Sequence, residues 1–171
     1  MSTRTQEQIT AWFAGRLPDG WFEGPAMVQS DHDEVWVVGK IAAPALAGEA
    51  TDEAKAAAAE ARVRRFREDT REERVRVARE AEHVFRRRVA WGVEIDGERT
   101  MFTVRSTPVM TRLHLPQRQV LDTLVDAGVA RSRSDALGWC VKLVGTHEES
   151  WIADLRGALH DVDQVREQGP Q

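Results

Sequence analysis

The sequence predicts an α+β fold: an N-terminal unit of helix, β-hairpin, long helix and β-hairpin, followed by a strand, two helices and a C-terminal amphipathic helix. Three observations predict this fold. Residues 51–87 have a helical pattern, residues 89–104 alternate around an Asp-Gly turn, and residues 109–144 change from a period of two to a helical period. The expected domains are 1–105 (α+β), 106–146 (strand and two helices) and 147–171 (C-terminal helix and tail).

The composition is that of an ordinary globular protein. The chain has 171 residues, of which 42% are hydrophobic and 30% charged, and a net charge of −4. A uniformly basic coat for nucleic acid is thereby excluded. The sequence has no signal-peptide pattern and no apolar run long enough for a membrane span, so we expect a cytoplasmic protein without a membrane partner.

Positive charge is concentrated in one segment. Residues 1–104 carry 16 basic and 19 acidic side chains, residues 105–145 carry 6 and 3, and residues 146–171 carry 2 and 6. Only the middle segment has a positive balance, which favours a local nucleic-acid contact there.

The first elements are predicted from short patterns. Residues 6–13 indicate an amphipathic helix. Residues 26–29 and 34–41 are typical of a β-hairpin. Its tip, Asp31-His32-Asp33, is interpreted as a polar turn rather than a metal site, because three consecutive side chains cannot all face one ion.

The long helical region begins after Thr51, which is followed by two acidic residues. The run Thr70 to Glu73 has the spacing of a second capping box and predicts a division into two helices near Asp69. Many charges on this region stand four residues apart and are expected to neutralise one another. These pairs are Glu60 with Arg64, Glu72 with Arg76, and Glu82 with Arg86.

A second hairpin has the clearest local pattern. Asp96-Gly97 predicts a two-residue type I′ turn that places Ile95 opposite Glu98. The same register places Glu94 opposite Arg99 on the other face. It further predicts that Trp91 faces Phe102 and that Val89 faces Val104.

Residues 109–144 predict a strand followed by two helices. The strand is Met110 to Leu115, ended by Pro116, and Gly128 follows the first helix. Ser132 can cap the second helix, with Asp135 at the capping-box position. The lone Cys140 lies on an apolar helical face and is expected to be a core residue. So short a unit cannot bury a core by itself, which implies a second copy.

This stretch resembles the ribbon-helix-helix DNA-binding family. The features that carry the resemblance are the alternating strand ending in Leu115-Pro116, the Leu121 and Leu124 face, the Gly128 turn, and the run from Ser132 to Leu137. The resemblance covers about a fifth of the chain and implies a homodimer, or a higher oligomer, whose two-stranded ribbon enters the major groove of double-stranded DNA.

The resemblance also implies roles for individual residues. Base-reading residues would be Met110, Arg112 and His114. Phosphate-binding residues would be Arg131, Ser132, Arg133 and Ser134. The dimer core would contain Thr111, Leu113, Leu115, Leu121, Leu124, Leu137 and Val141.

The last helix is expected to start at a third capping box, Thr146 to Glu149. It carries an apolar stripe interpreted as core or dimer contact, with docking of another protein as the alternative. The stripe consists of Trp151, Ile152, Leu155, Leu159 and Val162.

The sequence contains no glycine-rich phosphate loop, zinc spacing or nucleophile elbow. We therefore expect no enzyme, no cofactor and no metal. The favoured function is sequence-specific transcription regulation through DNA binding. Two alternatives remain: a dimeric scaffold that uses the ribbon only for dimerisation, and an antitoxin-like protein-interaction module.

Overall fold

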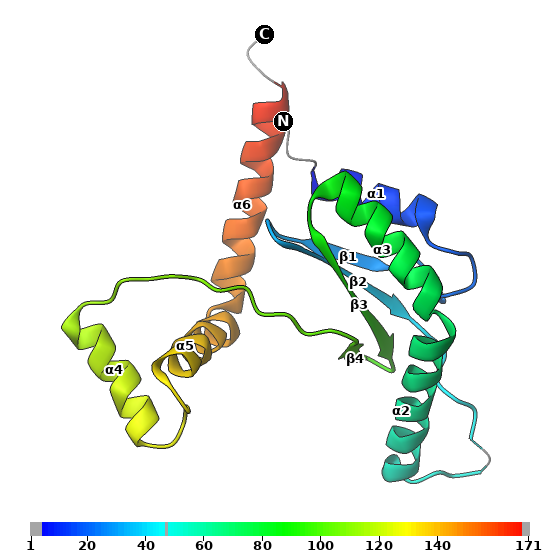
Figure 1. Ribbon diagram of the computed structural model, residues 1–171, viewed down its shortest axis with the longest axis horizontal. Coiled ribbons are helices and arrows are strands. Elements are labelled where there is room, and N and C mark those ends of the chain that lie inside the picture. Colours follow the sequence, from blue (N-terminus) through cyan, green and yellow to red (C-terminus); the bar gives the residue numbers. More distant parts are fainter. Residues whose placement is uncertain (1–4, 47, 169–171) are drawn as a thin grey trace. The chain divides into compact units, whose positions relative to one another are not determined.

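The computed structural model describes residues 5–46 and 48–168 and confirms the α+β class (Figure 1). The chain forms two compact units, Met1–Pro108 (unit 1) and Val109–Gln171 (unit 2). Unit 1 contains α1 (Gln6–Arg16), β1 (Met27–Ser30), β2 (Glu34–Lys40), α2 (Asp52–Asp69), α3 (Arg71–Phe85), β3 (Arg88–Ile95) and β4 (Glu98–Met101). Unit 2 contains α4 (Leu115–Asp126), α5 (Arg133–His147) and α6 (Glu149–Gln168).

Unit 1 is a four-stranded sheet in the order β1-β2-β3-β4, with α1 and α3 on one face (Figure 1). Both predicted hairpins are present and antiparallel. They are joined by parallel pairing of β2 with β3, which the local patterns did not predict. The core between sheet and helices consists of Ile9, Phe13, Val35, Val37, Val77, Ala81, Val89 and Trp91.

The second hairpin has the predicted turn and register. Asp96 and Gly97 both have positive φ, 51° and 87°, as a type I′ turn requires. Ile95 is opposite Glu98, and the amide of Phe102 donates to the Trp91 carbonyl at 2.8 Å. The expected pairing of Val89 with Val104 is wrong, because β4 ends at Met101 and Val104 is 85% exposed.

The long helical region is divided at Thr70, as predicted, but not by a capping box. The Thr70 hydroxyl donates to the Phe66 carbonyl at 2.6 Å and makes no cap to α3. Of the predicted ion pairs, Glu60 with Arg64 is present at 3.0 Å. The pairs Glu72 with Arg76 and Glu82 with Arg86 are wrong, since Arg76 pairs with Glu73 and Arg86 lies past the end of α3.

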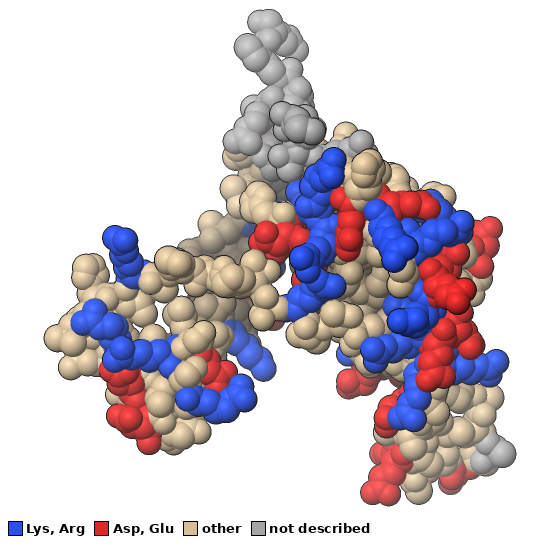
Figure 2. Space-filling model, viewed as in Figure 1, with Lys and Arg blue, Asp and Glu red and all other residues tan. Residues whose placement is uncertain are grey.

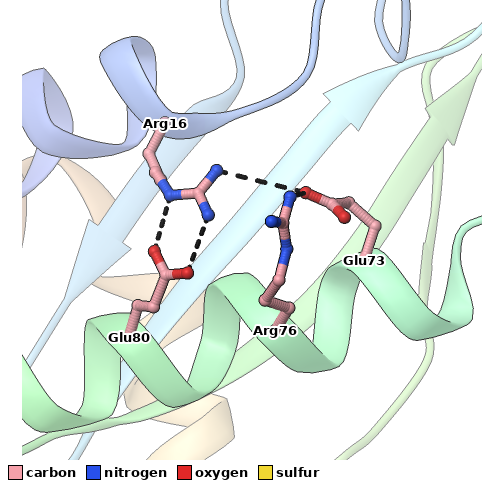
Figure 3. Close-up of polar contacts among 4 residues, drawn as sticks. All are labelled: Arg16, Glu73, Arg76 and Glu80. Atoms are coloured by element: carbon pink, nitrogen blue, oxygen red, sulfur yellow. Dashed lines mark hydrogen bonds and ion pairs between the residues drawn. The ribbon is translucent and has the colours of Figure 1, made fainter.

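An ion-pair network joins α1 to α3 (Figure 3). The Arg16 guanidinium donates to both carboxylate oxygens of Glu80, at 2.6 and 2.7 Å, and lies 4.0 Å from Glu73, which also pairs with Arg76. The hydrogen bond from Arg16 lowers the pKa of Glu80. Acidic and basic side chains alternate over the visible surface of α2 and α3 (Figure 2), so this surface offers no continuous basic patch.

The tip of the first hairpin is the polar turn that the sequence predicts. One carboxylate oxygen of Asp31 accepts hydrogen bonds from the amides of Asp33 and Glu34, both at 2.8 Å. These two bonds lower the pKa of Asp31. The carboxylate is thus occupied by its own turn.

The third predicted capping box is wrong. Glu148 separates α5 from α6, and the Thr146 hydroxyl donates back to the Lys142 carbonyl at 3.0 Å. The expected tail falls partly on residues 169–171, which lie outside the described residues. Throughout 5–46 and 48–168, no helix has both the length and the apolar run that a bilayer crossing requires.

Candidate nucleic-acid interface

The helix pair of unit 2 is fixed by its caps and by the turn between the helices. The His114 amide donates to the Gln117 side chain at 2.8 Å at the start of α4. After α4, Gly128 has φ 73° and the amides of Val129 and Ala130 donate to the Leu124 carbonyl. Only a residue that tolerates positive φ allows this reversal, which explains the glycine. The predicted glycine turn is therefore confirmed.

The predicted cap of α5 is also present. The Ser132 hydroxyl accepts a hydrogen bond from the Asp135 amide at 3.2 Å. The Asp135 carboxylate accepts from the Arg131 amide at 3.0 Å rather than from Ser132, so the capping box is shifted by one residue. The start of α5 is consequently held by a fixed turn, and the residues from Ser132 to Asp135 are exposed.

Only a small core holds α4 against α5. Leu121, Ala130 and Ala136 are the buried residues in the described part of unit 2. Cys140 packs against them from a half-buried position, as expected for a core residue. Leu113, Leu124, Val125 and Leu137 pack around the same cluster. The single chain therefore leaves most of the apolar surface of this unit uncovered.

The predicted dimer-core residues have different exposures in the single chain. Leu121 is buried, whereas Leu113, Leu124 and Leu137 are half-buried. Thr111, Leu115 and Val141 are exposed, the last two at 60% and 66%. The first group forms the helix-pair core, and the second faces solvent when no partner chain is present.

The predicted strand Met110 to Leu115 is not formed within the single chain. Residues 103–114 have no regular secondary structure, and Leu115 is already the first residue of α4. A strand needs backbone hydrogen bonds from a neighbour, and no described residue of unit 1 or unit 2 supplies them here. The predicted strand is therefore absent from the single chain, and Leu115 belongs to α4 instead.

The three expected base-reading residues lie on this exposed segment. Met110 is 97% exposed, and Arg112 and His114 are also exposed. Among the described residues, none forms an ion pair or a hydrogen bond with the Arg112 side chain. The guanidinium of Arg112 is therefore free to donate to a ligand, which is what a contact with guanine requires.

The expected phosphate-binding arginines are both paired within unit 2. Arg133 donates to the two carboxylate oxygens of Asp122 at 2.6 and 2.7 Å, and Arg131 donates to Asp135 at 3.2 Å. The hydrogen bonds from these arginines lower the pKa of Asp122 and contribute to the lowered pKa of Asp135. The sequence analysis predicted neither pair. Asp122 and Arg133 meet only when α4 folds back against α5, whereas Arg131 and Asp135 are only four positions apart, a spacing that could have indicated their pair.

Ser132 and Ser134 line a hollow of about 520 Å³ over the first turns of α5. Trp139 and Lys142 line the same hollow from the next turns of the helix. Neither residue was predicted as part of a site, although Lys142 follows Trp139 by three positions and so lies on the same helical face. The hollow combines hydroxyls, an ammonium group and an aromatic side chain.

Each of the two units matches a known family of protein domains. Residues 7–101 match the family described as Rv1265-like protein, N-terminal domain, and residues 114–166 match the Mb1296 C-terminal domain. The chain belongs to the Rv1265-like family. The unmatched interval between the two domains contains the boundary at Pro108 between the structural units. Sequence families and three-dimensional contacts thus divide the chain in the same region.

Two mycobacterial proteins are close in sequence to this chain. The chain is 58% identical over 159 residues to the uncharacterized proteins Mb1296 of Mycobacterium bovis and Rv1265 of Mycobacterium tuberculosis. The aligned part is 93% of this chain and 69% of each relative. No solved structure gives a significant match. Neither family description names a DNA-binding fold, so an assignment of function rests on residues and geometry.

Proposed function

We propose that unit 2 of two chains forms a ribbon-helix-helix dimer that binds double-stranded DNA in a sequence-specific manner and acts in transcription regulation. One observation carries this proposal. Of the 17 large apolar side chains that are exposed in the described part of the chain, 13 lie in unit 2, from Val109 onwards. So much apolar surface on a small unit with three buried residues favours a second copy as its cover.

The segment before α4 supports an intermolecular ribbon. Residues 103–114 have no regular secondary structure and no strand partner among the described residues, and Thr111 and Arg112 are exposed in succession. In a strand, consecutive side chains point to opposite faces. Pairing of two copies would bury Thr111 and Leu113 on the helices and leave Met110 and Arg112 on the outer face.

The start of α5 supports phosphate binding. The first amides of the helix that have no intrahelical partner and the hydroxyls of Ser132 and Ser134 are donors of the kind that hold phosphates at helix N-termini. The pair of Arg133 with Asp122 uses Nε and one terminal nitrogen, which leaves the other terminal nitrogen of Arg133 able to donate. Arg131 is 93% exposed and can contribute charge.

Substitutions at two adjacent residues, whose side chains would point to opposite faces of the ribbon, test the oligomer. Thr111→Asp should give monomers, because the dimer buries this position and an unpaired carboxylate cannot be buried there at low cost. Arg112→Asp should remain dimeric, because this side chain faces outward. Sedimentation equilibrium on the full chain distinguishes them. Identical oligomeric states for both variants would contradict the ribbon.

DNA binding is tested by selecting preferred duplexes from a random pool and then measuring affinity for the selected site. Arg112→Ala should weaken binding by about 1–3 kcal/mol. Arg156→Ala on α6 removes the same charge from an exposed position off the ribbon and should leave affinity nearly unchanged. Equal binding of every variant to every duplex would refute sequence reading by Arg112.

A non-enzymatic dimeric scaffold is the second candidate. It is favoured by the ion pairs that Arg131 and Arg133 form with aspartates of the same unit, because arginines paired in this way are less available to phosphates. In that case the ribbon serves dimerisation only, and the exposed α6 stripe containing Trp151 and Leu155 contacts a protein partner in the manner of an antitoxin. A dimer without salt-dependent DNA binding would support this candidate over the first.

A further inference from the structure

A second cavity lies entirely in unit 1, at the end of the sheet where β2 and β3 begin (Figure 1). Its volume is about 500 Å³, within the range typical of small-molecule sites. The turn between β1 and β2 forms one wall, and the chain between α3 and β3 forms another. The amide of Arg88 donates to the Asp33 carbonyl at 3.0 Å, which holds these two walls together.

Three arginines line this cavity: Arg86, Arg88 and Arg105. Arg86 ends α3 with φ 59°, which turns the chain so that Arg86 and Arg88 both reach the cavity. Arg105 comes from the segment after β4. Among the described residues, no side chain forms a hydrogen bond or an ion pair with any of the three guanidinium groups. This differs from Arg16, Arg64 and Arg133, which all have carboxylate partners.

The carboxylate of Glu34 lines the same cavity, and only one of its two oxygens accepts a hydrogen bond from a described residue. One oxygen of Glu34 accepts from the Trp36 indole at 2.8 Å. The other oxygen is buried and has no donor among the described residues. A buried acceptor without a donor is unfavourable, so the carboxylate of Glu34 is suited to accept a hydrogen bond from a molecule bound in the cavity that this residue lines. His32 adds a further polar group beside it.

We propose that this cavity binds a small phosphorylated molecule that also carries hydroxyl or amine donors, such as a nucleotide or a sugar phosphate. The arginines would hold the phosphate oxygens through charge-assisted hydrogen bonds, and Glu34 would accept from a hydroxyl or an amine. A DNA backbone fits less well, because its phosphodiesters and deoxyribose carry no hydroxyl or amine donor for the buried Glu34 oxygen.

The inference is independent of DNA binding by unit 2 and is tested with small ligands. Isothermal titration of the full chain would use AMP, ATP, ribose 5-phosphate and inorganic phosphate as probes. Arg88→Gln and Arg105→Gln should each weaken nucleotide binding by about tenfold or more, because each removes a charged donor. Arg79→Gln is the matched control, since Arg79 is an exposed residue of α3 that does not line the cavity.

Glu34 is tested by ligand preference. The parent should bind ribose 5-phosphate more tightly than inorganic phosphate, and Glu34→Gln should reduce this ratio. The comparison on the parent stands even if Glu34→Gln impairs folding, which thermal melting would reveal. Three results would overturn the proposal: no saturable binding of any probe, equal binding by the parent and both arginine variants, or variants that weaken duplex DNA binding alone.

Discussion

The guanidinium of Arg74 lies over the ring of Phe102, 4.8 Å from its centroid, in the interior of unit 1. Arg74 is 8% exposed and donates to the Thr70 hydroxyl at 2.9 Å and to the Arg67 carbonyl at 2.6 Å. No carboxylate pairs with it among the described residues, and burial lowers its pKa to about 10. The contact holds the start of α3 against the residue at which the chain leaves β4.

We expect the packing of Arg74 to matter more than its charge. Arg74→Met keeps the bulk beside Phe102 and removes a desolvated cation, so the free energy of unfolding should stay within about 1 kcal/mol of the parent. Arg74→Ala leaves a cavity and should lower it by roughly 2–4 kcal/mol. Denaturant unfolding measures both. Equal losses in the two variants would show that the hydrogen bonds of Arg74 dominate instead.

The contrast between the two hairpins and the rest of unit 1 shows what the sequence could predict. Asp96-Gly97 defines turn type and register within ten residues, so the pairing of Ile95 with Glu98 followed from local chemistry. The parallel pairing of β2 with β3 joins strands separated by two helices. No local pattern encodes that partner, because parallel pairing depends on how the intervening helices pack.

The same distinction applies to the candidate interface. The Gly128 turn and the Ser132 cap were predictable, since each depends on neighbours within four residues. The pair of Arg133 with Asp122 spans 11 positions and forms only after α5 returns along α4. The strand predicted before Leu115 is absent from the single chain, and in the proposed dimer it would need a second copy to supply its backbone hydrogen bonds.

A close approach between Gly39 and Phe22 gives a second stability prediction. A Cβ atom at Gly39 would overlap the Phe22 ring, which stacks on Phe66 at 5.7 Å. Gly39→Ala should therefore displace the ring and lower the free energy of unfolding by about 1–3 kcal/mol. Gly15→Ala in α1 is the control, because nothing lies within 4 Å of its Cβ position. We expect it to be neutral or stabilising. Thermal melting that ranks the two variants in the opposite order would contradict this packing.

The Asp31 turn predicts acid sensitivity. Two amide donors lower the folded-state pKa of Asp31 below its ordinary value of 3.8. Its contribution to stability is therefore fully present above the unfolded-state pKa and is lost as pH falls through the lower folded-state value. Asp31→Asn should be less stable than the parent at neutral pH, and the difference should shrink below about pH 4. Unfolding by denaturant across this pH range measures it. A difference that stays constant with pH would show that the carboxylate charge is irrelevant.

The pair of Asp122 with Arg133 predicts how DNA affinity can be raised, if the proposed function is correct. Asp122→Asn removes the carboxylate that holds the guanidinium of Arg133 and frees its donors at the start of α5. We expect severalfold tighter binding to duplex DNA, and a dependence of log K on log salt that is steeper by about one unit, as for one added phosphate contact.

The control for that prediction is Asp126→Asn. Asp126 is an exposed residue of the same helix, and no side chain of the described residues pairs with it. Both substitutions raise the net charge by one, so long-range attraction of DNA rises equally in the two variants. Only Asp122→Asn releases Arg133. A larger gain in affinity for Asp122→Asn than for Asp126→Asn would therefore locate a phosphate contact at Arg133, whereas equal gains would mean that Arg133 supports the helix pair and does not contact DNA.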